Sequence, residues 1–154
     1  MLELTPDLER YIEKHSQAEP PLLADLSKAT HLRVLRPRML SGNLQGWLLR
    51  MLCEMLHARR VLEIGTYTGY ASIAMAMGMA EDGVLHTIDV NDELEDFALD
   101  YVRRAGLEKR VVLHVGDALE IIPRLDETFD LVFIDADKRE YSDYYRLVFD
   151  KVRV

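Results

Sequence analysis

The sequence predicts an α/β fold, in which helices lead into a parallel sheet of about four strands. From about residue 58 onward, short apolar runs alternate with patterns of helical period, which is typical of βαβ units with right-handed crossovers. The runs are short and mostly apolar, as expected for strands covered on both faces. We therefore expect a single domain over 1–154, with a helical prefix over 1–57 and an α/β core over 58–154.

The helical prefix contains three predicted helices, over about 6–15, 22–34 and 45–57. Thr5 can cap the first helix with its hydroxyl, and Pro6 suits the first helical position. Pro20-Pro21 separates the first two helices, and the second ends before Pro37 because proline disfavours helix in the residue that precedes it. The third helix is apolar at helical spacing, and we expect its Cys53 in the core.

The α/β core contains four predicted strands, Val61–Ile64, Val84–Ile88, Val111–Val115 and Leu131–Ile134. The helices that follow them are predicted over about 71–79, 93–105, 117–122 and 138–150. Asp92 can cap the second of these helices, and Gly106 ends it. Because parallel strands end at the same edge of a sheet, we expect the residues after the four strands to share one rim.

Composition and charge exclude several classes of function. The net charge is −8, and residues 61–154 carry twenty acidic against ten basic residues, which argues against broad electrostatic binding to nucleic acid. Arg33, Arg36 and Arg38 form a small positive area, which we interpret as a solvated helix face. No apolar stretch approaches the roughly 18 residues of a membrane span, and the N-terminus lacks a secretory pattern. The single cysteine favours a reducing cytoplasm, and we expect no membrane partner.

The loop Gly65-Thr-Tyr-Thr-Gly69 indicates a nucleoside cofactor. Glycine has no Cβ, so a ligand can approach the backbone closely. Asp89 follows the second strand, 24 residues after Gly65 and near the roughly 20 expected for an acid that binds ribose hydroxyls. Asp89 lies too early to cap the next helix. A nicotinamide dehydrogenase is a disfavoured alternative, because the loop lacks the second glycine of G-x-G-x-x-G.

Several segments resemble motifs of the S-adenosylmethionine-dependent O-methyltransferases, most closely the metal-dependent catechol and caffeoyl-CoA group with its bacterial relatives. The segments lie at 39–46, 61–70, 86–91, 116–123 and 129–138. The glycine loop is general to the superfamily, whereas Asp135-Ala-Asp-Lys138 is much more specific. The resemblance covers about residues 35–150 and implies a Rossmann-like methyltransferase fold.

The resemblance implies a residue set for S-adenosylmethionine. Residues beside its methionine part are Met39, Glu63, Gly65 and Tyr67. Asp89 would bind the ribose, and Asp135 would face the amine. The residues at the adenine would be Val90, Asp117 and Ala118. The family has serine directly after Gly-Tyr, whereas this chain has Ala71 and then Ser72. Ser72 is therefore included in the cofactor set, with that hydrogen bond expected to be shifted or lost.

The implied reaction is methyl transfer to a hydroxyl of a small, catechol-like aromatic acceptor. A divalent metal (Mg or similar) would be bound by Asp135, and Lys138 would be the general base; the alternative for Lys138 is a surface lysine paired with Asp137 or Glu140. The family continues past the position of Val154 into further strands of a seven-stranded sheet and an Asp-Asn pair that completes the metal site. We therefore expect this chain to bind metal weakly or not at all.

Two further hypotheses stay open beside this one. Some bacterial relatives methylate a hydroxylated uridine in tRNA, and the three arginines would then contact phosphate. Alternatively, the chain is a truncated fragment that binds S-adenosylmethionine without turnover. We expect a homodimer through the N-terminal helices. The histidines His57, His86 and His114 are scattered without metal-ligand spacing, and the tyrosines Tyr141, Tyr144 and Tyr145 are expected to pack the last helix.

Overall fold

The computed structural model describes residues 5–153 and has the predicted α/β architecture. Its four strands are β1 (Arg60–Ile64), β2 (Val84–Asp89), β3 (Val111–Val115) and β4 (Leu131–Ile134). All neighbours pair in parallel, in the order β3-β2-β1-β4. The helices are α1 (Pro6–His15), α2 (Pro21–Arg33), α3 (Gly42–Leu56), α4 (Tyr70–Gly78), α5 (Glu95–Arg104), α6 (Ala118–Ile121) and α7 (Tyr141–Phe149). Three 3₁₀ turns complete the fold: η1 (Pro37–Met39), η2 (Asp92–Leu94) and η3 (Ile122–Arg124).

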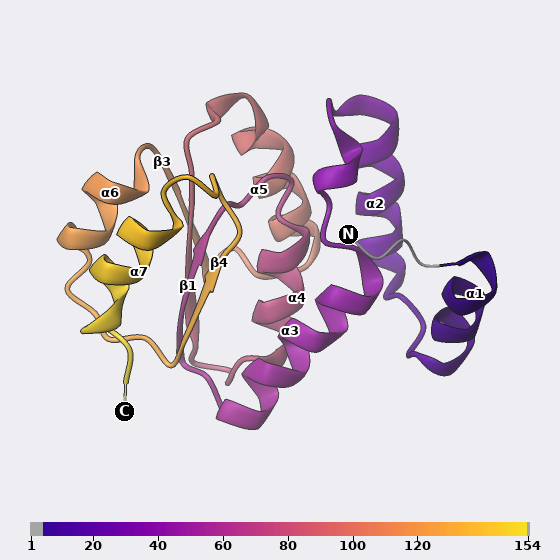
Figure 1. Ribbon diagram of the computed structural model, residues 1–154, viewed down its shortest axis with the longest axis horizontal. Helices are drawn as coiled ribbons and strands as arrows, with labels where there is room; N and C mark the ends of the chain where they lie inside the picture. Colours follow the sequence, from indigo (N-terminus) through magenta and orange to yellow (C-terminus); the bar gives the residue numbers. More distant parts are fainter. Residues whose placement is uncertain (1–4, 154) are drawn as a thin grey trace.

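Helices cover both faces of the sheet (Figure 1). The helices α2 to α5 lie on one face, and α6 and α7 lie on the other. Alternate residues of a strand therefore enter different cores: Val61 packs with the first set of helices, whereas Leu62 and Ile64 pack with the second. This two-sided burial explains why the strands are short apolar runs rather than polar–apolar alternations. Within the described residues, no helix is both long and apolar enough to span a membrane.

Most predicted boundaries of the N-terminal half are confirmed within a few residues. The Thr5 hydroxyl accepts the N–H of Leu8 at 3.4 Å, and Pro6 occupies the first turn of α1. Cys53 is fully buried, as predicted. The third helix begins at Gly42, three residues earlier than the pattern indicated.

The start of the helix after β2 was predicted wrongly. The chain first makes the turn η2, and the cap is Asn91 rather than Asp92, because the Asn91 side chain accepts the N–H of Glu93 at 3.0 Å. Asp89 places this cap, since its Oδ1 accepts the N–H of Asn91 at 2.9 Å. A side chain that bonds the backbone two residues later stabilises a turn at the expense of helix.

The start of the last helix was also predicted wrongly, by three residues. The carboxylate of Asp137 accepts the N–H of Arg139 at 3.0 Å and closes a turn of its own. Lys138 therefore lies in a loop before α7, not in its first turn. Tyr144 packs into the core as expected, but Tyr145 is 57% exposed and does not.

Candidate functional site

A cavity of about 1240 Å³ lies at the carboxyl ends of the four strands. Residues at or just after the strand ends line it, and so does the segment of residues 34–41, which we call the strap. A pocket for one small ligand usually has roughly 300–1,000 Å³. The cavity is therefore large enough for a cofactor and a second small molecule, and it lies at the rim that the sequence indicated.

Gly65 lets two loops meet at the floor of this cavity. Its φ is +106°, and a Cβ added there would lie 2.3 Å from the carbonyl oxygen of Asp135. That neighbour is backbone and cannot move aside as a side chain could. The loops after β1 and β4 therefore approach each other only because residue 65 has no side chain.

Asp89 holds the glycine loop and also faces the cavity. Its Oδ2 accepts the N–H of Tyr67 at 2.7 Å, and its Oδ1 accepts the N–H of Asn91 at 2.9 Å. A carboxylate oxygen can accept two hydrogen bonds, so each oxygen retains one lone pair for a ligand. The next residue, Val90, is 74% exposed and offers an apolar surface in the same cavity.

Glu63 lies beneath the cavity instead of lining it. Its side chain is fully buried, its Oε2 accepts hydrogen bonds from Ser72 and Thr87, and its Oε1 has no partner among the described residues. Burial raises the pKa of Glu63 to about 8, and the nearby carboxylates of Asp135 and Asp89 add to the rise, while the two hydroxyl donors oppose it. The carboxyl is therefore mostly protonated at neutral pH.

Ser72 belongs to this buried cluster too. Its hydroxyl donates to Glu63, so it is not among the residues that line the cavity. Thr66 and Thr87 lie 2.5 Å apart at their hydroxyl oxygens and extend the cluster. Together these side chains fix the glycine loop and the start of α4 to the sheet.

Tyr67 joins the glycine loop to the strap. Its hydroxyl donates to the carbonyl oxygens of Leu35 at 3.0 Å and Arg36 at 3.2 Å. Tyr67 and Arg36 both have left-handed backbone conformations, with φ of 49° and 58°. Met39 ends η1 within the strap and is 56% exposed in the cavity.

The loop after β4 supplies Asp135 and Lys138, both exposed and both in the cavity wall. The alternative of a Lys138 ion pair is not found within residues 5–153. Asp137 instead pairs with Arg139, which holds the pKa of Asp137 down at about 2. Glu140 accepts the hydroxyl hydrogen of Tyr144. Lys138 is thus left to face the cavity.

The structure therefore brings most of the predicted site residues together. Those that line the cavity are Met39, Gly65, Tyr67, Asp89, Val90, Ala118, Asp135 and Lys138. Those that do not are Glu63, Ser72 and Asp117. Asp117 is exposed and caps α6, because its Oδ1 accepts the N–H of Leu119 at 2.8 Å.

Three cavity residues were only partly predicted from the sequence. Arg33, Arg36 and Arg38 are exposed, as predicted, but they do not share one helix face, and all three line the cavity. Only Arg33 is in an α-helix, at its last position; Arg36 is in the left-handed conformation, and Arg38 lies in η1. A usable signal was present, because the sequence has no acidic residue between Asp25 and Glu54 that could neutralise them.

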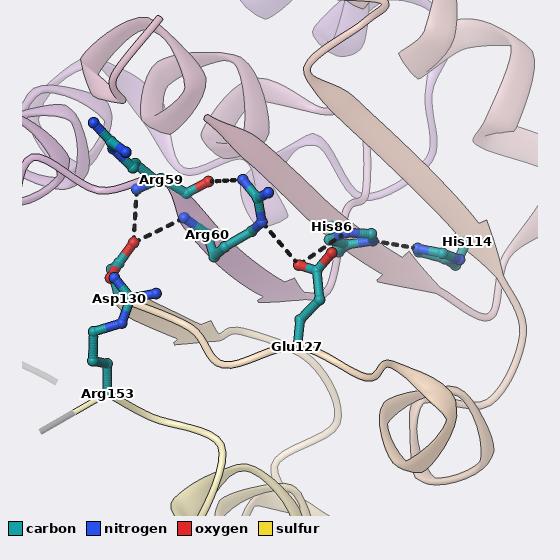
Figure 2. Close-up of polar contacts among 7 residues, drawn as sticks. All are labelled: Arg59, Arg60, His86, His114, Glu127, Asp130 and Arg153. Carbon is teal, nitrogen blue, oxygen red and sulfur yellow. Dashed lines mark hydrogen bonds and ion pairs between the residues drawn. The ribbon is translucent and has the colours of Figure 1, made fainter. Parts of the chain in front are cut away.

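The described residues do not make up a metal site. No three His, Cys, Asp or Glu side chains among them are arranged to hold a metal ion, so Asp135 belongs to no such cluster there. Two histidines expected to be scattered are nevertheless paired: Nδ1 of His86 lies 2.9 Å from Nε2 of His114, and Nε2 of His86 lies 3.5 Å from a carboxylate oxygen of Glu127 (Figure 2).

Comparisons with known proteins agree with this geometry. A family model described as O-methyltransferase matches residues 13–154. Among curated proteins, caffeoyl-CoA O-methyltransferase 5 of Nicotiana tabacum is 34% identical over 116 residues, which cover 71% of this chain and 48% of that protein. The chain spans about half the length of the curated relatives that head this comparison.

Solved structures have the same fold. The crystal structure of the O-methyltransferase TomG of Streptomyces achromogenes, in complex with SAM, matches with a TM-score of 0.87 and 33% identity, over 96% of this chain and 67% of that one. The O-methyltransferase of Bacillus cereus in complex with SAH matches with a TM-score of 0.88 and 28% identity, over 96% and 68%. These matches confirm the Rossmann-like fold predicted from the sequence.

Proposed function

The chain belongs to the O-methyltransferase family, and on that premise we propose that it carries out methyl transfer from S-adenosylmethionine to a hydroxyl of a small, catechol-like aromatic. The observation that carries the proposal is Asp89: a carboxylate fixed by two backbone N–H groups, with unused lone pairs that face a cavity of about 1240 Å³. Vicinal ribose hydroxyls are well matched to two carboxylate oxygens.

The residues that line the cavity support a binding site for each part of the cofactor. Asp89 binds the ribose, and Val90 and Ala118 contact the adenine. The loop at Gly65 and Tyr67, together with Met39 of the strap and Asp135, surrounds the methionine part. Asp117 contributes by capping α6 and so positioning Ala118. Glu63 and Ser72 contribute from below, by holding the glycine loop.

Lys138 is the proposed general base. When bound, the cofactor supplies an electrophilic methyl group on a sulfonium. An acceptor phenol has an ordinary pKa near ~10 and is mostly protonated at neutral pH, so its oxygen must lose a proton as it attacks. Lys138 faces the cavity without an ion-pair partner among the described residues. In its neutral amine form, the Nζ of Lys138 would accept that proton and become an ammonium, while the walls of the cavity would hold the acceptor in line with the methyl group.

Further predictions accompany this proposal. A divalent metal would need ligands besides Asp135, and no cluster of three candidate ligands is found among the described residues, so we derive no step from it. A homodimer through the N-terminal helices and a cytoplasmic location stay predictions from the sequence. The division into a helical prefix over 1–57 and an α/β core over 58–154 of one methyltransferase domain is likewise our proposal.

One alternative acceptor is favoured by a specific observation. Arg33, Arg36 and Arg38 line the cavity, and a tRNA hydroxyuridine would bring phosphates to them. A fragment that binds the cofactor without turnover is the remaining alternative. Activity with tRNA that falls steeply with salt would distinguish the first, and cofactor binding without transfer to any acceptor would distinguish the second.

Calorimetric titration of the purified protein with S-adenosylhomocysteine tests the cofactor. We expect saturable one-to-one binding, and no binding of NAD under the same conditions. Transfer of a labelled methyl group to 3,4-dihydroxybenzaldehyde then tests the reaction. Binding of NAD without binding of S-adenosylhomocysteine would contradict the proposal.

A further inference from the structure

We propose that Arg33, Arg36 and Arg38 form a subsite for an anionic group of the acceptor, a carboxylate or a phosphate remote from the hydroxyl that is methylated. This inference rests on the proposed function and adds the chemical class of the acceptor. The three arginines line the same cavity as Asp89 and Lys138. They lie at the end of α2, in the strap and in η1.

The first observation is that these arginines lack partners. Within residues 5–153, every other arginine side chain forms an ion pair or a hydrogen bond: Arg10, Arg50, Arg59, Arg60, Arg103, Arg104, Arg110, Arg124, Arg139, Arg146 and Arg153. Arg33, Arg36 and Arg38 are the exceptions, and all three are in the cavity wall. In a chain of net charge −8, this is an unusual concentration of unpaired positive charge.

The second observation is that the strap is fixed in place. The Tyr67 hydroxyl donates to the carbonyl oxygens of Leu35 and Arg36, and the N–H of Tyr67 is held by Asp89. Arg36 also keeps a left-handed backbone, which costs a non-glycine residue about 1 kcal/mol and persists where the surroundings enforce it. The guanidinium groups therefore start from a preorganised backbone. Their planar forks match carboxylate and phosphate oxygens.

The acidic residues of the same cavity argue for one anionic group on a small molecule. Asp89, Asp135 and Asp137 also line the cavity, and residues 61–154 carry twice as many acidic as basic residues. A polyanion would meet repulsion there, whereas a dipolar acceptor can direct its anion to the strap and its hydroxyl to Lys138. We therefore favour a small anionic acceptor over a nucleic acid.

The test uses three catechols: 3,4-dihydroxybenzoate carries a carboxylate, caffeoyl-CoA carries phosphates, and 3,4-dihydroxybenzaldehyde is neutral. Each is titrated by calorimetry into the protein saturated with S-adenosylhomocysteine. We expect at least one charged catechol to bind roughly tenfold or more tightly than the aldehyde, because charge-assisted hydrogen bonds contribute about 1.5–3 kcal/mol. Which charged catechol binds identifies the anionic group.

The variant R33Q/R36Q/R38Q removes the subsite, and Arg124→Gln is the control. Arg124 is an exposed arginine of η3 and pairs with Glu120. We expect the triple variant to lose the preference for charged catechols while it still binds S-adenosylhomocysteine, and the control to retain the preference. Equal binding of charged and neutral catechols by the original protein would overturn the inference.

Two further outcomes separate this inference from the proposed function. Absence of S-adenosylhomocysteine binding would remove the proposed function itself, and with it the premise. Methylation of tRNA that depends on the three arginines, with no affinity for any of the catechols, would overturn the small acceptor and leave the methyltransferase reaction standing.

Discussion

Asp89 and Asp130 perform the same local task at opposite ends of the sheet, with different consequences. Each carboxylate accepts two backbone N–H groups: Asp89 those of Tyr67 and Asn91, and Asp130 those of Arg59 and Arg60. The Oδ1 of Asp130 also pairs with Arg153 at 2.7 Å, and its side chain is only 11% exposed (Figure 2). Asp89 forms no ion pair with any described residue and lines the cavity.

The two ends of the sheet differ in the same way as these two residues. At the amino ends of the strands, charged groups neutralise one another: Arg60 pairs with Glu127, and Arg59 with Asp82. At the carboxyl ends, Lys138 and the three cavity arginines are left without ion pairs among the described residues. A charged group held in place but not neutralised is available to a ligand. This contrast, more than the acidic residues themselves, identifies the functional end.

The lysines of the two ends give the largest expected difference. Lys138→Met should lower kcat by roughly 100-fold or more, because a general base contributes about 10²–10⁴ in rate. It should leave the affinity for S-adenosylhomocysteine unchanged. Lys151 at the other end donates to the carbonyl of Leu125 at 2.7 Å, so Lys151→Met should lower stability by about 1 kcal/mol and leave kcat unchanged. Initial rates and thermal melts of both variants measure this, and a Lys138→Met enzyme with ordinary kcat would remove Lys138 from the mechanism.

The glycines of the two ends differ in what surrounds them. Gly65 and Gly106 both have positive φ, but a Cβ at Gly65 meets backbone at 2.3 Å, whereas a Cβ at Gly106 meets nothing within 4 Å. Gly106→Ala should therefore cost only about 1 kcal/mol, the strain of a left-handed residue. Gly65→Ala should cost several times more and abolish cofactor binding, because the loops after β1 and β4 must separate. Chemical denaturation and calorimetry compare the pair; equal costs would mean that the approach of the two loops is not needed.

The paired aspartates test the comparison directly. Asp89→Ala should weaken S-adenosylhomocysteine binding roughly 100-fold, because two hydrogen bonds to a charged group are lost. Asp130→Ala should lower stability by about 3 kcal/mol, since it leaves Arg153 and the N–H groups of Arg59 and Arg60 without their acceptor. Its affinity for the ligand should stay within about twofold of the original value. If Asp130→Ala weakened binding of S-adenosylhomocysteine as much as Asp89→Ala does, the two ends of the sheet would not differ in their contribution to binding.

Carboxyl groups near the two ends should also give opposite pH dependences. Burial raises the folded-state pKa of Glu63 from 4.5 to about 8, so the folded state keeps a proton that the unfolded state releases. Stability is then lost as pH rises from 4.5 to 8, by about 1.4 kcal/mol per unit for this group.

For Asp130 the shift is in the other direction. Burial opposes it, but the N–H groups of Arg59 and Arg60 and the charge of Arg153 hold the pKa below its usual 3.8. Stability from Asp130 is present above pH 3.8 and is lost as pH falls below that value. Melts across pH 3–9 should show that Glu63→Gln flattens the loss of stability between pH 4.5 and 8, and that Asp130→Asn flattens the loss below pH 3.8. An unchanged slope between pH 4.5 and 8 in Glu63→Gln would mean that Glu63 is ionised when buried.

The parts of this molecule that the sequence predicted are those set by local pattern. The strands were predicted to within one residue because each is a short, mostly apolar run that ends at a polar residue or a glycine. The starts of α5 and α7 were missed because Asp89 and Asp137 bond the backbone two residues later, a competition that helical period does not register. The arginine subsite was missed because the strap is positioned by Tyr67, more than thirty residues away. Likewise, His86 and His114 are 28 residues apart and meet only when β2 and β3 pair.

That histidine pair gives the smallest expected effect and the sharpest check on the separation of the two ends. His114 is packed by His86, which also faces Glu127 and Phe129, while Arg60 reaches Glu127 from β1. Burial and the neighbouring His86 hold the pKa of His114 below its usual 6.5, so its contribution to stability is present above pH 6.5 and is lost as pH falls. His114→Gln should therefore change stability by less than about 1 kcal/mol and reduce its loss in mild acid.

The His114→Gln variant is informative because His114 lies close in the chain to a residue that is hydrogen-bonded to Asp89. Only Val115 separates His114 from Gly116, whose N–H donates to the carbonyl of Asp89 at 2.8 Å. If hydrogen bonding of the strand ends alone positions Asp89, His114→Gln should leave the affinity for S-adenosylhomocysteine unchanged between pH 5 and 8. Calorimetry at both pH values decides the matter. A variant that binds more weakly, or that removes a pH dependence of binding, would show that the histidine pair acts on Asp89 through β3.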